Sequence, residues 1–265
     1  MYLRQMETED LAILLEMAHV EGWSSEMLEF ELHTQLNPDG CFTCIEDNNV
    51  VGGVMTFTYP GSGWIGNLVV DRKYRLKGFG KALFRRALRQ LSHLPTQFLC
   101  ASPMAVGLYS GFEFDKVMDI FRWECKDRAF SPMEYELNIK KILELDEKYW
   151  HEDRSKMLEP FLAHRSCLCN KGACLGYGKV MDHWTIGPWI AENIEAAIDI
   201  LDRSMIRKKG ECILVDVPAQ NTFAWDILNA MGFEVVGKTV FMCRGKFPDI
   251  EFDNIYGFTS MGSKG

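Results

Sequence analysis

A glycine-bearing segment between a predicted strand and a predicted helix carries the residue types best suited to chemistry. The segment 67–82 ends its strand at Asp71 and then places Arg75, Gly78 and Gly80 ahead of an amphipathic helix. The first backbone N–H groups of a helix have no partner inside it, and the helix dipole adds partial positive charge, so this arrangement can bind a phosphate or pyrophosphate. Glycine lets the backbone approach a ligand without a Cβ in the way. The segment predicts an anion-binding loop, and the alternative is a tight turn without a ligand.

The spacing of this segment excludes two other kinds of phosphate-binding loop. A Walker loop needs a Gly-Lys pair followed by Ser or Thr, whereas Ala82 follows Lys81 and no earlier glycine stands at the required offset. A dinucleotide-binding loop needs a third glycine at the position that Leu83 occupies. Neither loop type therefore explains the segment.

The pattern Arg75-x-x-Gly78-x-Gly80, after a strand ending in Val-Val-Asp, resembles the acyl-CoA pyrophosphate loop of the GNAT acetyltransferase superfamily. The resemblance implies acetyl-CoA as the acyl donor and no metal. By this resemblance the pantetheine arm would be held by Leu68, Val69 and Val70. The pyrophosphate would be held by Arg75, Leu76, Lys77, Gly78, Phe79, Gly80 and Lys81. A buried central strand is the other interpretation of 68–70, and both can hold because the pantetheine arm would contact backbone groups.

Tyr109 is the candidate proton donor. By the same resemblance, GNAT enzymes often place a Tyr ahead of a Gly-Phe turn, where its hydroxyl can protonate the departing thiolate of CoA. Here Tyr109 stands two residues before Gly111, whereas the usual spacing in the family is four. Either a shortened helix still brings the hydroxyl to the sulfur, or Tyr109 is a core aromatic residue.

No residue is assigned as the general base that would take a proton from an acceptor amine. In the first half of the chain, Asp71 fits a turn or cap and Glu46 fits a solvent-facing position beside a hairpin. In the second half Asp153, His183 and Asp216 are candidates, and such residues are more often structural than catalytic.

The elements that would position these residues follow from hydrophobic periodicity. A short strand opens the chain, and helices are predicted from about Asp10 and over 27–36. A hairpin that turns at Asn48-Asn49 and the strand 64–71 form a meander. The helix after the glycine loop and a strand at 97–101 follow. This order is similar to the GNAT fold, an α/β fold whose mixed, mostly antiparallel sheet is flanked by helices.

The second half of the chain repeats the pattern of the first. Gly66 aligns with Gly187 and Gly111 with Gly232, and both separations are 121 residues. One supersecondary unit therefore occurs twice, which predicts a tandem GNAT protein with two similar lobes. The segment 125–133, which lacks apolar periodicity, is the predicted linker. The predicted domains are an N-terminal, acetyl-CoA-binding GNAT domain at 1–127, a C-terminal GNAT-like domain at 134–250, and a C-terminal tail at 251–265.

The second lobe lacks the features that would bind acyl-CoA. Its segment 188–200 has no glycine and places Glu192 and Glu195 where an anion would lie, so the carboxylates would repel a pyrophosphate. Leu228 stands at the position expected for the proton-donating Tyr. This lobe is predicted to complete the acceptor pocket or to stabilise the pair rather than to bind the cofactor.

Composition limits the partners and the location. With 265 residues, 47% hydrophobic and 25% charged, the chain has the composition of a soluble globular protein. A net charge of -8 argues against nucleic acid as a partner, because phosphate-backbone binding needs a basic surface. No run is long and apolar enough for a membrane span, and no signal peptide is recognised. The expected location is the cytoplasm, with the nucleus not excluded, and the expected state is a monomer or homodimer.

The nine cysteines do not predict a zinc site. Most lie in apolar runs, where free thiols behave as small hydrophobic residues, and this favours a reducing compartment. On a strand, Cys41 and Cys44 would project to opposite faces. Cys167, Cys169 and Cys174 lie in the matching hairpin of the other lobe, so a joint zinc site would require the two hairpins to meet.

Together these observations predict an acyltransferase, in particular an acetyl-CoA-dependent N-acetyltransferase in which a primary amine attacks the thioester directly. The partners would be a coenzyme A thioester and an amine acceptor. The alternative is a non-catalytic acyl-CoA-binding or scaffold protein that retains the GNAT fold.

Overall fold

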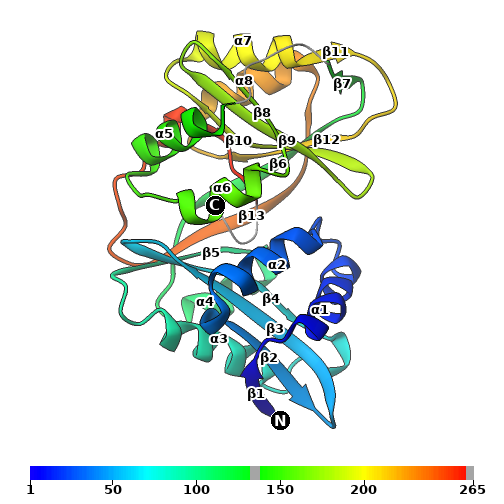
Figure 1. Ribbon diagram of the computed structural model, residues 1–265, viewed down its shortest axis with the longest axis vertical. Coiled ribbons are helices and arrows are strands. Elements are labelled where there is room, and N and C mark those ends of the chain that lie inside the picture. The colour runs from blue at the N-terminus through cyan, green and yellow to red at the C-terminus, as the bar shows by residue number, and fades with distance from the viewer. Residues whose placement is uncertain (132–137, 261–265) are drawn as a thin grey trace. The chain divides into compact units, whose positions relative to one another are not determined.

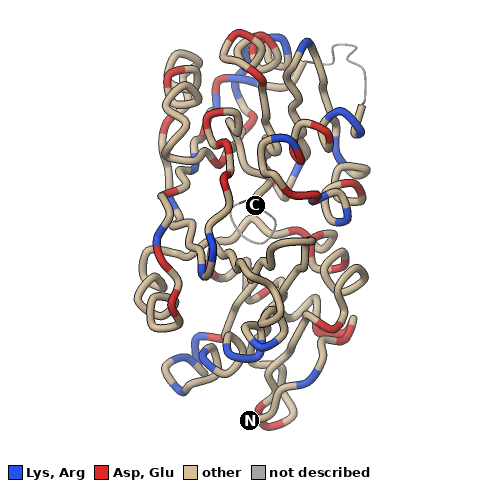
Figure 2. The backbone as a smooth tube through the Cα atoms, turned by 90° about the vertical axis from the view of Figure 1, so that its left-hand side faces the viewer, with Lys and Arg blue, Asp and Glu red and all other residues tan. Residues whose placement is uncertain are grey.

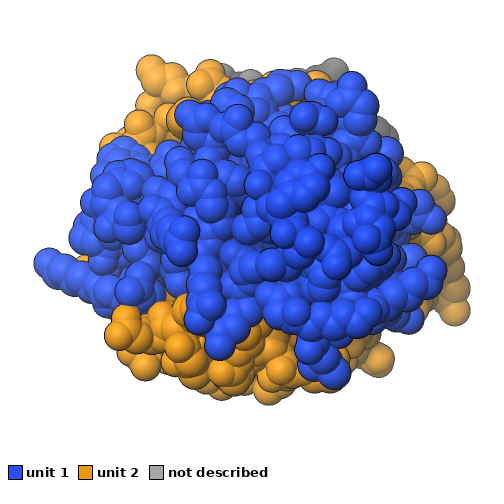
Figure 3. Space-filling model, turned by 90° about the horizontal axis from the view of Figure 1, so that it is seen from below, with its two compact units in different colours: residues 1–99, 243–246, 262–264 blue, residues 100–242, 247–261, 265 orange. Residues whose placement is uncertain are grey.

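The computed structural model of the chain describes residues 1–131 and 138–260. These residues form two compact units, which Figure 3 colours separately. Unit 1 consists of Met1–Leu99 and Cys243–Lys246, and unit 2 of Cys100–Met242 and 247–260. Parts of three predicted segments lie outside the described residues: 132–133 of the linker, 134–137 of the C-terminal domain and 261–265 of the tail.

The sheet of unit 1 has the strand order β1-β2-β3-β4-β5 (Figure 1). Neighbouring strands are antiparallel except β4 and β5, which are parallel and are joined by the crossover helix α3. The elements, in chain order, are β1 (Tyr2–Gln5), α1 (Thr8–Val20), α2 (Met27–Leu36), η1 (Pro38–Gly40), β2 (Cys41–Glu46), β3 (Asn49–Thr58), β4 (Ser62–Val70), η2 (Arg72–Tyr74), α3 (Phe79–Gln90) and β5 (Thr96–Ala101).

Different helices cover the two faces of this sheet. Successive strand residues point to opposite faces, so neighbours along β2 show which helix lies on each side. Cys41 packs in a buried cluster with Leu14 of α1 and Phe30 of α2. Phe42 lies under Arg86 of α3, whose guanidinium carbon is 4.2 Å from the ring centroid. The α1–α2 pair therefore covers one face and α3 the other.

The main sheet of unit 2 has the strand order β13-β6-β12-β10-β9-β8, with β14 on β10, while β7 and β11 form a separate two-stranded sheet. The elements, in chain order, are η3 (Pro103–Ala105), α4 (Val106–Ser110), β6 (Asp115–Cys125), β7 (Arg128–Phe130), α5 (Ile139–Trp150), α6 (Ser155–Leu162), β8 (Ser166–Asn170), β9 (Ala173–Val180), β10 (His183–Ala191), α7 (Ile194–Ser204), β11 (Met205–Arg207), β12 (Ile213–Pro218), α8 (Thr222–Met231), β13 (Glu234–Gly245), η4 (Phe252–Asn254) and β14 (Ile255–Gly257).

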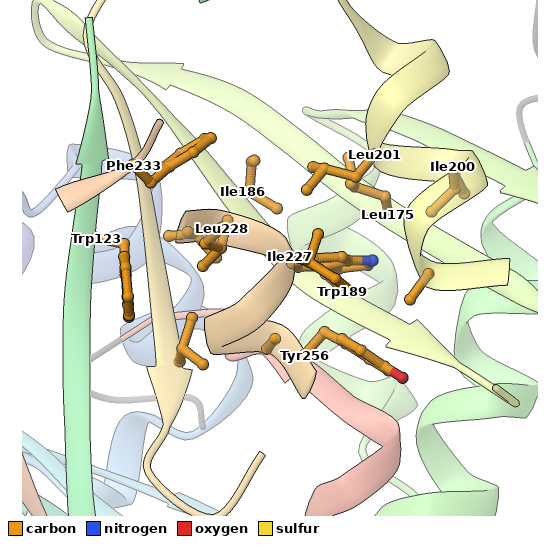
Figure 4. Packing of buried hydrophobic residues seen from close by; sticks show 14 of the residues in the cluster. Trp123, Leu175, Ile186, Trp189, Ile200, Leu201, Ile227, Leu228, Phe233 and Tyr256 are labelled. Carbon is orange, nitrogen blue, oxygen red and sulfur yellow. The ribbon is translucent and has the colours of Figure 1, made fainter. Parts of the chain in front are cut away.

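A large aromatic and aliphatic cluster forms the core of unit 2 (Figure 4). Leu228 of α8 is fully buried, and it packs in one cluster with Trp123 of β6 and Trp189 of β10. Tyr256 of β14 belongs to the same cluster and is 1% exposed. The core of this unit therefore includes residues from both halves of the chain and from its C-terminal segment.

The compact units differ from the predicted domains because the last strand of each sequence repeat pairs outside that repeat. β6, at the end of the first repeat, is antiparallel to β12 over the whole length of β12. The end of β13 belongs to unit 1, where the N–H of Lys246 donates to the carbonyl of Pro95 at 3.2 Å. The first segment of unit 1 therefore ends at Leu99 rather than at 127.

The structure also corrects the predicted tail and linker. Residues 251–260 are folded in unit 2, where β14 pairs with β10 and Phe258 is 1% exposed. A three-residue strand is too short to produce a detectable hydrophobic period. Within the predicted linker, Ala129 is buried in β7, which pairs with β11.

None of the helices in residues 1–131 and 138–260 has both the length and the apolar character needed to cross a membrane.

Candidate functional site

The strand β4 is paired with β5 over only part of its length. The parallel pairing joins Ser62–Trp64 to Thr96–Phe98, and in the described residues it ends there, whereas β4 continues to Val70. On its other side β4 stays paired with β3 as far as Val70. The second half of β4 therefore has one edge that β5 does not use, and its backbone groups can bind an extended ligand there.

A β-bulge lies in this half-paired part of β4. The register of β4 against β3 shifts between the Gly53–Val69 and Met55–Gly66 pairs. Asn67, inside the shift, has a φ of 50°, in the left-handed region that Asn adopts more readily than most residues. The bulge turns backbone groups out of the regular ladder just before the segment predicted to bind the pantetheine arm.

The three residues predicted for that arm lie in β4 as expected. Val69 is 3% exposed and packs in the α1–α2 cluster, whereas Leu68 and Val70 are half-buried. The buried-strand interpretation is thus correct for the Val69 side chain, and it leaves backbone contacts available.

The loop between β4 and α3 has two left-handed residues. Gly78 has a φ of 91°, which glycine adopts freely, and it is the N-cap of α3. Leu76 has a φ of 61° and a fully exposed side chain. A left-handed conformation is strained for leucine, and such strain is concentrated at ligand-binding sites.

The first turn of α3 presents its N–H groups at this loop. The first intrahelical bond runs from the N–H of Ala82 to the carbonyl of Gly78 at 3.0 Å, so the N–H groups of the three preceding residues come before the helical ladder. A Cβ at Gly78 would have no described atom within 4 Å, and one at Gly80 would be 3.6 Å from Val70 Cγ2. Packing in unit 1 therefore does not require glycine at position 80.

The Arg75 side chain binds the protein itself. Its Nη2 lies 2.7 Å from Glu21 Oε1, and its Nε donates to the carbonyl of Val70 at 3.0 Å. Arg72 Nε contacts the same Glu21 oxygen at 2.8 Å. The hydrogen bond from Arg75, followed by that from Arg72, holds the pKa of Glu21 below its usual value. Arg75 thus links the loop to the end of α1. Because its side chain makes these contacts, only its backbone is available for the predicted contact with a pyrophosphate.

The remaining loop residues give the segment a local positive character. Lys77 and Lys81 are exposed, and Lys77 Nζ lies 5.3 Å from the centroid of the Tyr74 ring. Phe79 is 5% exposed and meets Tyr74 edge-on, which anchors the start of α3. Charges of both signs are spread along the rest of the chain, as Figure 2 shows.

Tyr109 lies in α4, and the left-handed residue of the turn that follows is four positions further along the chain, which is the spacing expected from the resemblance. The left-handed residue that ends the helix is Glu113, with a φ of 67°, whereas Gly111 has ordinary right-handed angles. The N–H of Phe114 donates to the carbonyl of Tyr109 at 3.3 Å, so the turn closes five residues after Tyr109, and the left-handed Glu113 stands four residues after it. The count to Gly111 was therefore wrong, because glutamate holds the position where glycine was expected.

The same turn occurs in the second repeat. Gly232 has a φ of 84°, and the N–H of Phe233 donates to the carbonyl of Leu228 at 3.0 Å. Glu113, and not Gly111 as predicted, therefore corresponds to Gly232, and Leu228 corresponds to Tyr109. Burial raises the pKa of the Tyr109 hydroxyl to about 12, so this hydroxyl keeps its proton at neutral pH.

In unit 2 the equivalent strand gap is filled by the chain itself. β10 is parallel to β12 only at Trp184–Ile186, and beyond that point β14 pairs with β10 in the antiparallel sense. The N–H of Phe258 donates to the carbonyl of Asp216 in β12 at 2.8 Å. A Cβ at Gly187 would lie 2.0 Å from the carbonyl oxygen of Phe258. The C-terminal segment thus occupies the edge that would bind a pantetheine arm in this unit.

The five carboxylates and imidazoles considered as a base all make structural contacts. Asp71 caps η2 by accepting from the N–H of Lys73, and Glu46 pairs with the N-terminal ammonium group. The other three residues make local or paired contacts in unit 2: Asp153 with the N–H of Ser155, His183 with Asp182, and Asp216 with Arg122 through two bonds of 2.8 Å.

Sequence reasoning missed a buried carboxylate beside the bulge. Glu29 of α2 is 7% exposed, and its Oε1 accepts a hydrogen bond from Asn67 Nδ2 at 3.2 Å. One turn further along α2, His33 is fully buried on the same side of the helix. The available signal was the i, i+4 spacing of Glu29 and His33 around the apolar Phe30.

No three His, Cys, Asp or Glu side chains are grouped as metal ligands in the described ranges. Cys41 and Cys44 are both buried, and burial raises the pKa of each thiol.

Both halves of the chain match known families. Residues 8–113 match the acetyltransferase (GNAT) family, and residues 142–257 match an acetyltransferase (GNAT) domain. The chain therefore belongs to the GNAT superfamily, with one match in each half, which confirms the tandem arrangement predicted from the repeat.

Several known proteins are similar over most of the chain. A putative acetyltransferase from Pyrococcus horikoshii has a TM-score of 0.84 at 23% identity, with 100% of this chain and 95% of that chain covered. A tandem GNAT protein from the clavulanic acid biosynthesis pathway has a TM-score of 0.63 at 12% identity, with 93% and 99% covered. YitH, an uncharacterized N-acetyltransferase of Bacillus subtilis (strain 168), is 24% identical over 215 residues, or 74% of each chain. These similarities confirm the predicted fold class.

Proposed function

We propose that this GNAT protein is an acetyl-CoA-dependent N-acetyltransferase whose cofactor site is the β4–α3 segment of unit 1. The observation that carries the proposal is the combination of a half-paired strand with a helix N-terminus directly after it. An extended pantetheine arm carries amide groups that can hydrogen-bond to a free strand edge, and a pyrophosphate suits the N–H groups of a helix start.

The residues present fit such a ligand. Leu68 and Val70 offer backbone groups along the strand edge, and the start of α3 offers the N–H groups of Phe79, Gly80 and Lys81. Gly78 and Gly80 keep Cβ atoms away from that place, although packing does not demand glycine at position 80. The loop is held to α1 through Arg75, so it can be in place before the ligand arrives.

The bound thioester would supply the acetyl group, and the protein would supply position and polarity. A primary amine would attack directly, and placing it beside the carbonyl carbon supplies much of the rate in reactions of this type. Backbone N–H groups at the β4 bulge are suited to polarise the thioester carbonyl. Tyr109 belongs to unit 2, and its role as proton donor to the sulfur stays a prediction from the sequence; its hydroxyl stays protonated at neutral pH.

We further propose one cofactor per chain. In unit 2, β14 lies along the equivalent strand edge, and Glu192, near the start of α7, contacts Lys148 Nζ at 3.2 Å. Leu228 offers no proton where the second sequence repeat has the turn that corresponds to that of Tyr109. The cytoplasmic location, the absence of nucleic acid and membrane partners, and the monomeric or homodimeric state stay predictions from the sequence.

A thiol-release assay tests the proposal. The full chain is incubated with acetyl-CoA and each of three primary amines: 1,4-diaminobutane, 2-phenylethylamine and the dipeptide Ala-Ala. Release of CoA that depends on an amine, with the N-acetylated product identified by mass spectrometry, is the expected result. Acetyl-CoA binding without turnover of any primary amine in a wider panel would favour the non-catalytic acyl-CoA-binding alternative.

A further inference from the structure

Two cysteines of unit 2 face each other across the hairpin of β8 and β9. Cys169 of β8 and Cys174 of β9 are direct partners in the register of the two strands. The Cys174 thiol donates a hydrogen bond to Cys169 Sγ, with the two sulfur atoms 2.7 Å apart. Cys174 is fully buried, whereas Cys169 is half-buried and belongs to the strand at the end of the sheet order. The proposed acetyl transfer uses neither thiol.

The turn of this hairpin determines how closely the two cysteine side chains approach. Lys171 and Gly172 form a two-residue turn, and their φ angles of 31° and 86° both lie in the left-handed region. In such a hairpin the pair beside the turn, Asn170 and Ala173, exchanges backbone hydrogen bonds. The next pair, the two cysteines, is then of the non-hydrogen-bonded kind, with Cα atoms about 4.5 Å apart and the closer side chains. A disulfide needs Cα atoms about 4.4–6.8 Å apart, so the backbone at this pair already suits one.

The surroundings of the pair distinguish its two thiols. The hydrogen bond to Cys169, followed by burial, raises the pKa of the Cys174 thiol, so Cys174 keeps its proton. The Cys169 thiol contacts the carbonyl of Asn138, the N-cap of α5, at 3.4 Å, and the charge of Lys141 in the first turn of α5 acts on the pair. A helix N-terminus and a nearby cation favour the thiolate form of a cysteine. Cys169, which accepts the hydrogen bond from Cys174, is therefore the thiol that more readily becomes a thiolate.

We propose that Cys169 and Cys174 are a redox modification site, which a low-molecular-weight disulfide such as glutathione disulfide oxidises to a cross-strand disulfide. The inference goes beyond the proposed function, because the reaction requires neither acetyl-CoA nor an acceptor amine. A small disulfide reaches the half-buried Cys169 first, and the buried Cys174 completes the bond. A reducing compartment keeps both residues as thiols until the proportion of disulfide in the small-thiol pool rises.

Atoms and electrons balance in two successive thiol–disulfide exchanges. The Cys169 thiol loses its proton, and its sulfur attacks the small disulfide RSSR, whose S–S bond breaks with the electron pair on the departing RS⁻. The Cys174 thiol then loses its proton, and its sulfur attacks Cys169 Sγ and expels the second RS⁻. The two RS⁻ groups take up the two protons and become RSH. The protein is oxidised by two electrons, and the small disulfide is reduced by the same two.

A count of the remaining thiols in the full chain tests the site. The reduced chain, which has nine cysteines, is incubated with a large excess of glutathione disulfide, quenched with acid and alkylated, and its peptides are identified by mass spectrometry. We expect the thiols of Cys169 and Cys174 to be lost together, as one crosslinked pair, at least about tenfold faster than any other thiol. An excess of dithiothreitol should restore all nine thiols.

Single substitutions separate the roles of the two thiols. Cys174→Ser removes the second thiol, so Cys169 should stay joined to one glutathione. Cys169→Ser should slow the loss of the Cys174 thiol at least about tenfold, because the remaining thiol is buried and protonated. Cys212→Ser is the matched control, since Cys212 is also half-buried in unit 2, and burial and its hydrogen bond to Glu124 raise its pKa to about 11. This control should leave the crosslink and its rate unchanged.

Three results with the wild-type chain would overturn the inference. The first is that both thiols survive the incubation with glutathione disulfide. The second is a crosslink that joins Cys169 or Cys174 to a third cysteine. The third is glutathione that stays on Cys169 while Cys174 remains a thiol, because the proposed pair closes in the second exchange. If a variant does not fold, as judged by circular dichroism, the peptide map of the wild-type chain decides by itself.

Discussion

Replacing Gly80 separates the stability of α3 from cofactor binding. A Cβ at this position would lie 3.6 Å from Val70 Cγ2, an ordinary van der Waals distance, so alanine fits the folded chain. Because glycine disfavours helix, Gly80→Ala should raise the free energy of unfolding by about 0.5–1 kcal/mol. Gly80→Gln gains a similar helix preference, and it places a longer side chain in the first turn of α3, where the pyrophosphate is proposed to bind.

The expected loss of affinity follows from the contacts that the longer side chain would displace. A hydrogen bond to a charged group contributes about 1.5–3 kcal/mol, and about 1.4 kcal/mol corresponds to a tenfold change in Kd. Loss of one backbone contact to the pyrophosphate should therefore weaken acetyl-CoA binding by about 10- to 150-fold in Gly80→Gln.

Calorimetric titration with acetyl-CoA and urea unfolding of the same samples measure both quantities. Gly80→Ala is the matched control, since its methyl group points toward Val70, and its Kd should stay within about threefold of the wild-type value. A Gly80→Gln chain that is folded and binds acetyl-CoA as tightly as Gly80→Ala would refute the placement of the pyrophosphate at this loop.

Three further predictions concern the loop clamp, the proton donor and the filled gap of unit 2. Glu21→Gln should weaken acetyl-CoA binding about three- to tenfold by loosening Arg75, as titration would show. Because the folded-state pKa of Glu21 is lowered, its ion pairs stabilise the chain above the usual carboxyl pKa and lose that effect as the pH falls through the folded-state value. The stability difference between Glu21→Gln and wild type, measured by urea unfolding, should thus shrink from pH 7 to pH 3, and a constant difference would contradict it. Tyr109→Phe should lower kcat by about 10²-fold or more at unchanged acetyl-CoA affinity, and an unchanged kcat would make Tyr109 a packing residue. Gly187→Ala should lower the free energy of unfolding, measured in urea, by about 1–3 kcal/mol, since its Cβ would lie 2.0 Å from the Phe258 carbonyl oxygen. An unchanged free energy of unfolding would show that the segment around Phe258 can shift at little cost.

The local signals in the sequence were strong enough to predict the fold class and the loop. Strand, glycine and helix periods are short-range features, so the positions of β4, Gly78 and α3 agree with what the residues indicated. The tandem repeat was visible for the same reason, because two copies of one local pattern recur along the chain.

Contacts between segments that are far apart in the sequence could not be predicted from these local patterns. Periodicity does not specify the partner of a strand, so the pairing of β6 with β12 and of β14 with β10 could not be read from either segment alone. Glu113 misled the count at Tyr109, because a non-glycine residue holds a left-handed position there. Glu29 stood in an amphipathic helix whose inward side could be identified only once Asn67 was placed beside it.

The strand β14 has a consequence for how ligand concentration acts on the chain. A ligand that binds only the folded state raises its stability in proportion to the logarithm of the free ligand concentration. Unit 2 carries its own peptide in the place of such a ligand, at an effective concentration fixed by the covalent chain. Under the proposed function, the stability of unit 1 would therefore rise with the acetyl-CoA concentration, whereas β14 occupies the corresponding strand edge of unit 2 at any acetyl-CoA concentration. Under the proposed function, the tandem arrangement would thus combine one unit whose stability depends on its ligand with one whose equivalent strand edge is already occupied by the chain itself.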